Sequence, residues 1–175
     1  PFRVEGELEI IDAVLGAVTE RTVLALIDTV TSPTGVRMPF EVLVSELQSK
    51  GVDVLLDAAH GPGIVPLDLT ELGVAYCTGN CHKWICTPKG SAFLHIRSDR
   101  KSGIRPLSIS HGATHEGSDQ ERFDYEFAWP GTQDPTPWLC IPKALEFIGG
   151  LVEGGWSEIM ERNRNLAIEG RGIVC

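Results

Sequence analysis

Two side chains in this 175-residue chain have the types and positions that covalent chemistry requires. Asp57 ends one hydrophobic run that is typical of a strand. Lys83 closes the run 76–83, whose first residues belong to the next predicted strand. A lysine amine can form a Schiff base with an aldehyde, and a carboxylate can keep a ring nitrogen protonated. An acid at one strand end and a lysine just past the next strand form the arrangement that a pyridoxal phosphate enzyme needs.

Short apolar runs predict the strands that would position these residues, at 22–27, 52–56, 74–77 and 91–96. The first run is apolar throughout, which favours a strand buried on both faces. Helical periodicity appears at 7–20 and 39–50, and a short helix is expected at 66–73. Strands that alternate with helices predict an α/β fold with a largely parallel sheet.

Polar residues follow several of the predicted strands. Ligands of open parallel sheets bind beyond the carboxyl ends of the strands, so these residues are expected to converge on one edge. They are Ser32, Asp57, His60 and Lys83. Further along, 98–130 reads as irregular, and 136–149 and 154–169 read as helices.

The composition excludes several functional classes. The net charge is −9, which argues against nucleic-acid or anionic-membrane surfaces, because both attract clustered Lys and Arg. Five cysteines without a disulfide framework suggest free thiols in the cytoplasm. No apolar run reaches the roughly 18 residues of a membrane span. The start is unlike a signal peptide, and both ends, Pro1 and Cys175, look cut.

Five segments resemble the class V aminotransferases, which are fold-type I pyridoxal phosphate enzymes. They are Thr31-Ser32-Pro33-Thr34-Gly35, Asp57-Ala58-Ala59-His60-Gly61-Pro62-Gly63, Gly79-Asn80-Cys81-His82-Lys83-Trp84, Pro88-Lys89-Gly90-Ser91-Ala92-Phe93-Leu94 and Gly131-Thr132-Gln133-Asp134. Within this family the chain is most similar to the isopenicillin N epimerase-like branch. The resemblance implies the three-layer, aspartate aminotransferase-like large domain, here incomplete.

The resemblance also implies a role for each matching residue. Lys83 would bind pyridoxal 5'-phosphate and act as the acid and base at Cα, and Asp57 would pair with the pyridinium nitrogen. His60 would lie near the phenolic oxygen of the ring, and Ser32 is a looser match to a ring-side contact. Phosphate contacts would come from Asn80 and His82, and across a homodimer from Thr132 of the neighbouring subunit.

Some positions depart from the family pattern. Ala75 stands where an acidic or small polar residue is common, and Asn80 and Cys81 stand where small residues are preferred. Thr29 replaces a histidine of many relatives, which puts a role for that loop in doubt. We expect residues 1–150 to be the central part of the cofactor-binding large domain. Residues 151–175 would begin a linker helix towards a small domain that is missing here.

Several alternatives remain open. The expected substrate is an amino acid, and Cα epimerisation leads, followed by C–S bond cleavage of the lyase or desulfurase type and then transamination. All three begin with loss of the same proton, so Lys83 and Asp57 do not separate them. A rival of another class is a non-catalytic scaffold remnant of this fold. A metal site is disfavoured, because Cys77, Cys81, His82 and Cys86 lack the spacing of a zinc site.

Overall fold

The structure is a computed structural model that describes residues 6–174, so the ends that the sequence predicts to be cut, Pro1 and Cys175, lie outside the described residues. The chain separates into two compact units. One comprises Pro1–His95 with Thr136–Cys175, and the other comprises Ile96–Pro135. The expected boundary between residues 150 and 151 stays a prediction.

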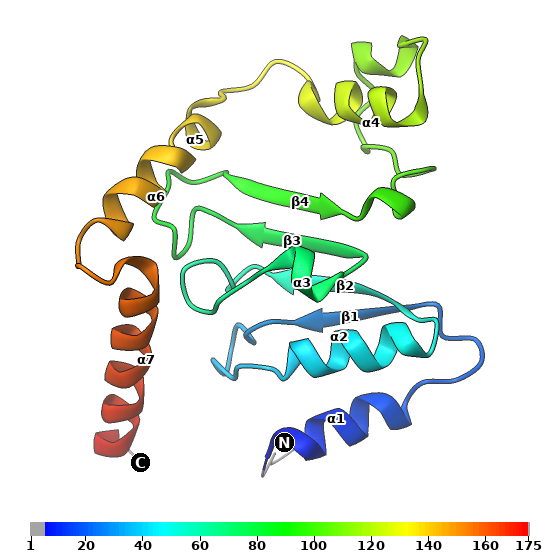
Figure 1. The fold of residues 1–175 in the computed structure, drawn as a ribbon. Helices are drawn as coiled ribbons and strands as arrows, with labels where there is room; N and C mark the ends of the chain where they lie inside the picture. Colours follow the sequence, from blue (N-terminus) through cyan, green and yellow to red (C-terminus); the bar gives the residue numbers. More distant parts are fainter. Residues whose placement is uncertain (1–5, 175) are drawn as a thin grey trace. The chain divides into compact units, whose positions relative to one another are not determined.

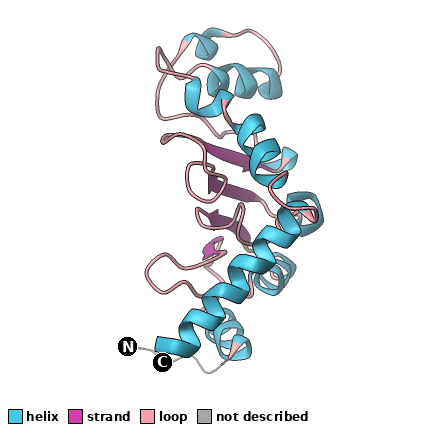
Figure 2. Cartoon of the chain, turned by 90° about the vertical axis from the view of Figure 1, so that its left-hand side faces the viewer, coloured by secondary structure: helices cyan, strands magenta, loops and turns pink. Residues whose placement is uncertain are grey.

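A four-stranded sheet forms the first unit's framework (Figure 1). The strands lie in the order β1 (Leu24–Asp28), β2 (Asp53–Ala58), β3 (Tyr76–Asn80) and β4 (Ala92–Ile96). The first three are parallel, and β4 runs in the opposite direction. Figure 2 looks onto the edge where β1, β2 and β3 end and where loops follow them. The predicted α/β class with a mostly parallel sheet is confirmed.

Helices cover one face of this sheet (Figure 1). α2 (Phe40–Ser49) packs on β1 and β2, and α1 (Glu7–Gly16) packs against α2. The buried residues of α2 recur at helical spacing, namely Phe40, Leu43, Val44 and Leu47. The short helix α3 (Leu69–Leu72) is capped at both ends. The carboxylate of Asp68 accepts two backbone N–H groups at its start, and Gly73 adopts a left-handed conformation after its end.

The opposite face of β1 is open, so the expectation that this strand is buried on both faces is wrong for this chain. Ile27 is buried on the α2 side, but Leu24 and Leu26 on the other side are 50% and 65% exposed. Alternate residues of a strand point to opposite faces, so an all-apolar run does not reveal that only one face is covered.

Three helices complete the first unit. They are α5 (Thr136–Leu139), α6 (Ile141–Gly149) and α7 (Gly155–Val174). The sequence predicts one helix over 136–149, whereas the structure divides it at Cys140. α7 extends beyond the predicted end at 169. No helix within residues 6–174 is long and apolar enough to cross a membrane.

The second unit contains two short 3-10 turns, Ser98–Arg100 and His111–Thr114, and the helix α4 (Asp119–Ala128). This helix corrects the irregular reading of residues 98–130. Ser118 and Glu121 form a capping box at its start, which is a local signal that the sequence carries. Buried Glu126 of α4 forms an ion pair with Arg105 in the same unit.

Candidate active site

Three polar residues form a row where the parallel strands end. The register pairs Asp28 with Asp57 and Asp57 with Thr78, so their side chains share one face of the sheet. The Asp57 carboxylate accepts the Ala59 N–H at 2.8 Å, which fixes it at the start of the loop after β2. Buried Thr29 donates its N–H, at 2.9 Å, and its hydroxyl, at 3.2 Å, to the Asp57 carbonyl oxygen.

Asp28 has an altered protonation equilibrium at this edge. Burial raises the pKa of the Asp28 carboxyl above its ordinary value of 3.8, and the neighbouring Asp57 raises it further. His60 acts in the opposite direction and lowers it. The strand register therefore brings two carboxyl groups together in a partly dry environment, where a second negative charge is unfavourable.

His60 joins the loop after β2 to the turn after β3. Its Nε2 lies 3.1 Å from the Lys83 amine, and its Nδ1 accepts the indole N–H of Trp84 at 3.2 Å. His60 and Lys83 are half-buried, and Trp84 is 47% exposed. The structure thus brings together two residues that lie 23 positions apart in the sequence.

Backbone geometry supports this contact. Gly63 has a φ of +86°, and a Cβ on it would lie 2.8 Å from the Trp84 carbonyl oxygen. Cys86, just after Trp84, has a left-handed φ of +62°, which is rare for a residue with a side chain. The loop after β2 therefore packs closely on the turn that carries Lys83, and only glycine fits at position 63.

Asn80 and His82 form a second hydrogen-bonded pair. The Asn80 side-chain nitrogen lies 3.1 Å from Nε2 of His82, and Nδ1 of His82 lies 2.7 Å from the Ser91 carbonyl oxygen. A carbonyl only accepts, so Nδ1 of His82 carries a proton and Nε2 of the neutral ring accepts from Asn80. Ser91, which immediately precedes β4, thus orients the ring of His82, the residue before Lys83.

The two remaining predicted residues stand apart from these contacts. Ser32 is exposed in the loop after β1, and within residues 6–174 no hydrogen bond joins it to Asp57, His60 or Lys83. Thr132 is exposed in the second unit, in the loop after α4. Their assigned roles therefore stay predictions.

Cysteines near the site are mostly buried. Burial raises the pKa of the Cys77 thiol to about 12, with a further contribution from Asp57, and burial also raises the pKa of Cys81. Cys86 is exposed. Across residues 6–174, no group of three or more His, Cys, Asp or Glu side chains could hold a metal ion.

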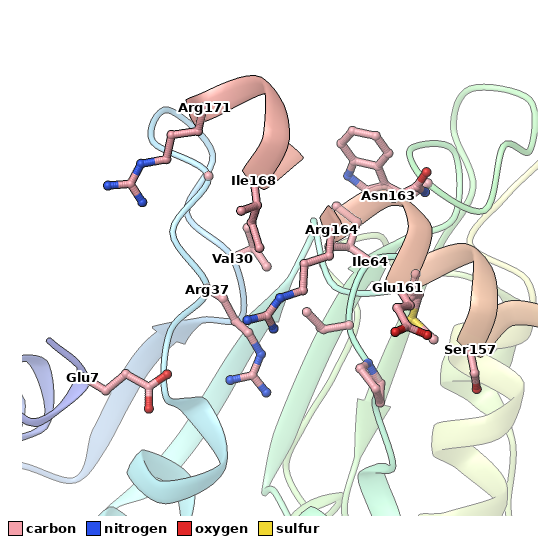
Figure 3. Close-up of a pocket in the computed structure, with 15 residues that line it drawn as sticks. Glu7, Val30, Arg37, Ile64, Ser157, Glu161, Asn163, Arg164, Ile168 and Arg171 are labelled. Atoms are coloured by element: carbon pink, nitrogen blue, oxygen red, sulfur yellow. The ribbon is translucent and has the colours of Figure 1, made fainter. Parts of the chain in front are cut away.

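A cavity of about 750 Å³ lies beside the site within the first unit (Figure 3). Its walls come from the loops after β1 and β2 and from α7, and they include Val30, Arg37, Ile64 and Arg164. Trp84, whose indole donates to His60, also lines this cavity. The lining combines apolar side chains with charged groups of both signs, namely Arg37, Arg164 and Arg171 together with Glu7 and Glu161.

Two residues at the site, Asp28 and Trp84, were not predicted from the sequence. Asp28 is the last residue of β1 and pairs in register with Asp57, the second-last residue of β2, so the rule that identifies Asp57 would also have identified Asp28. The Trp84–His60 contact gives no local signal, because it depends on how two loops pack together.

Comparisons with known proteins agree with this fold. A family model described as aminotransferase class-V matches residues 1–171. Isopenicillin N epimerase of Amycolatopsis lactamdurans is 34% identical over 168 residues, which are 91% of this chain and 42% of that protein. A probable chloroplastic L-cysteine desulfhydrase of Arabidopsis thaliana is 38% identical over 176 residues, 97% of this chain and 36% of that protein.

A solved structure shows the same fold. The cysteine desulfurase CsdA of Escherichia coli matches with a TM-score of 0.68 at 19% identity, over 82% of this chain and 37% of that chain. This chain therefore spans well under half the length of the relatives it matches. The family match extends over nearly all of it, and the chain belongs to the class V aminotransferase family.

Proposed function

We propose that this chain is the cofactor-binding part of an enzyme that moves the Cα proton of an amino acid, most like isopenicillin N epimerase. The observation that carries the proposal is the contact of the Lys83 amine with His60 at the sheet edge where β2, the strand that carries Asp57, ends. A nucleophilic amine and a carboxylate at one sheet edge are the two groups that this chemistry requires.

Pyridoxal phosphate is the cofactor of this family, and the side chains at the edge have the right chemistry for it. Lys83 offers the amine, and Asp57 offers a carboxylate held by the Ala59 N–H. Asn80 offers an amide N–H for a phosphate. His82, the other proposed phosphate contact, would donate from Nε2 only with a proton on that nitrogen, which accepts from Asn80 in this structure. When bound, the cofactor accepts the electrons left at Cα when the proton departs.

Each residue then has a defined task. Asp57 would hold a proton on the ring nitrogen, and His60 would lie near the phenolic oxygen of the ring. Ser32 is the proposed ring-side contact. Thr132 would contact the phosphate of the neighbouring subunit in a homodimer, which remains a proposal about an assembly of two chains.

Lys83 performs the proton transfer in this proposal. Its Nζ accepts the Cα proton as a free amine and becomes an ammonium group, which can return a proton to carbon. Epimerisation requires that the returned proton reach the opposite face of Cα. A partner acid on that face would therefore be needed in addition to Lys83.

A second candidate is cleavage of a C–S bond, as in a cysteine desulfhydrase. It is favoured by the 38% identity to the probable L-cysteine desulfhydrase of Arabidopsis thaliana. Lys83 would take the same proton, and the bond from Cβ to sulfur would then break with its electrons leaving on sulfur. Because that relative is named chloroplastic, a cytoplasmic location for this chain stays a prediction.

Cofactor binding tests the common part of both candidates. The chain is incubated with pyridoxal phosphate, reduced with borohydride and digested, and the mass of the Lys83 peptide is measured. We expect the cofactor on Lys83 and none in Lys83→Ala. The matched control is Lys89→Ala, which removes an exposed lysine six residues away and should retain the label. A wild-type chain without label would favour the scaffold alternative.

Product analysis separates the two activities. In deuterated water, an epimerase incorporates deuterium at Cα and yields the opposite enantiomer, which chiral chromatography detects. A C–S lyase instead releases sulfide from L-cysteine. Sulfide without enantiomer would reject epimerisation in favour of the second candidate. Formation of an α-keto acid together with an aminated cofactor would indicate transamination and reject both.

A further inference from the structure

We propose that Trp84 is a positioning residue that fixes the tautomer of His60 and so sets the direction of the hydrogen bond between His60 and the Lys83 amine. This inference rests on the proposed role of Lys83 and extends it to a residue outside the cofactor contacts. The geometry behind it is a continuous chain of two contacts, from the Trp84 indole to His60 and from His60 to Lys83.

The first step concerns the indole nitrogen. An indole N–H only donates, so the contact at 3.2 Å requires an unprotonated Nδ1 on His60. A doubly protonated imidazolium has no lone pair at Nδ1 and cannot accept this bond. The neutral ring must therefore carry its single proton on Nε2.

The second step concerns the amine. Nε2 of His60 faces the Lys83 Nζ at 3.1 Å, and a protonated Nε2 can only donate. An ammonium group has no lone pair to accept this bond, whereas a free amine has one. With Trp84 bound at Nδ1, the hydrogen bond from His60 to Lys83 forms only when Lys83 is a free amine, which is the nucleophilic form.

His82, the histidine next to Lys83 in the sequence, has a different hydrogen-bond pattern. Its Nδ1 donates to the Ser91 carbonyl oxygen, so its proton lies on the opposite ring nitrogen from that of His60. His60, which contacts Lys83, and His82, which precedes Lys83 in the chain, thus carry opposite tautomers. In each case the neighbouring group decides the tautomer, an indole donor for His60 and a carbonyl acceptor for His82.

The backbone holds Trp84 in place for this task. The close approach of Gly63 to the Trp84 carbonyl leaves no room for a side chain at position 63. The His60 and Trp84 rings are 6.5 Å apart and inclined at 56°, so they do not stack, and the directional N–H bond is the principal link between them. A role in packing alone would not require the indole nitrogen.

The experiment uses the chain free of cofactor, so that its result does not depend on activity. Long-range ¹H–¹⁵N correlation spectra of histidine-labelled protein report which ring nitrogen carries the proton, and His60→Gln identifies the His60 signals by their loss. We expect Nε2–H in the wild type. Trp84→Phe, which keeps an aromatic ring but removes the N–H, should introduce the Nδ1–H form.

Amine reactivity provides the second readout. Reductive methylation followed by mass spectrometry compares Lys83 with exposed Lys89 as an internal reference. Loss of one hydrogen bond in Trp84→Phe should lower the relative labelling of Lys83 by about fivefold. The matched control is Trp156→Phe, because the Trp156 indole donates to the Leu145 carbonyl oxygen at 3.1 Å and does not contact His60. This control should leave both readouts unchanged.

Two outcomes would overturn the inference. One is a wild-type His60 protonated on Nδ1, a measurement that holds even if Trp84→Phe does not fold. The other is a folded Trp84→Phe in which both the tautomer and the labelling ratio are unchanged. Failure of the proposed function is distinguishable, because it would appear as absence of cofactor on Lys83 while the His60 tautomer and labelling results still hold.

Discussion

Asp28 and Asp57 are register partners at the carboxyl ends of two neighbouring parallel strands, β1 and β2. Their side chains lie on the same sheet face, where burial and the charge of Asp57 raise the pKa of Asp28. If Asp57 binds a cationic ring nitrogen as proposed, part of this repulsion is relieved. Asp28 would therefore increase the preference of the site for a cofactor ring whose nitrogen is protonated.

The raised pKa of Asp28 predicts a pH-dependent stability. The folded state holds this proton more tightly than the unfolded chain, so its contribution is complete below the ordinary pKa of 3.8 and is lost as pH rises through the folded value. Asp28→Asn cannot ionise and avoids that loss. We expect the free energy of unfolding of Asp28→Asn to increase relative to that of the wild type as pH rises from about 4 to 7.

Urea unfolding at a series of pH values measures this difference. The control is Asp12→Asn, which removes one negative charge from an exposed position of α1, outside the site. If both variants follow the same pH profile, the effect comes from net charge and the coupling of Asp28 to Asp57 is contradicted.

The raised pKa of Cys77 predicts a protected thiol. With a pKa of about 12 and no exposed surface, Cys77 should be almost unreactive towards iodoacetamide at pH 8, whereas exposed Cys86 should be alkylated. Peptide mass spectrometry of briefly treated protein measures both positions. In urea the two rates should converge. Equal rates in the folded chain would contradict the burial of Cys77.

Gly79 in β3 is expected to tolerate no side chain. A Cβ there would overlap the Phe93 ring and lie 3.0 Å from the Ala58 carbonyl oxygen. Gly79→Ala should lower the free energy of unfolding by about 1–3 kcal/mol. In Gly170→Ala on α7, the new Cβ meets nothing within 4 Å. The free energy of unfolding of this variant should increase by up to about 1 kcal/mol. Equal effects of the two changes in urea unfolding would refute the close contact.

The buried carboxylate of Glu126 depends on Arg105 within the second unit. Arg105→Met should leave that charge unpaired and cost about 1–3 kcal/mol, less than for a fully buried pair because Arg105 is half exposed. Arg122→Met breaks an exposed pair with Asp119 and should cost under about 0.5 kcal/mol. Hydrogen exchange of the α4 amides measures both, and the double change Arg105→Met with Glu126→Leu should recover protection.

Local patterns predicted most of the framework. The periodicity of Phe40, Leu43, Val44 and Leu47 identified the buried face of α2, because a helix repeats every 3.6 residues. Apolar runs located all four strands to within a few residues. α4 was missed although Ser118 and Glu121 carry its capping signal, because its mean apolar content is low and no buried stripe marks it.

The sequence by itself determined which predicted strand each chemistry-bearing residue follows and the family to which the chain belongs. Motifs such as Gly79-Asn80-Cys81-His82-Lys83 are local in the chain, so their identity survives without coordinates. Only the tertiary structure decided that Trp84 contacts His60, that Asp28 faces Asp57 and that one side of β1 is open. These relationships depend on register and on the packing of separate loops, which no spacing along the chain can specify.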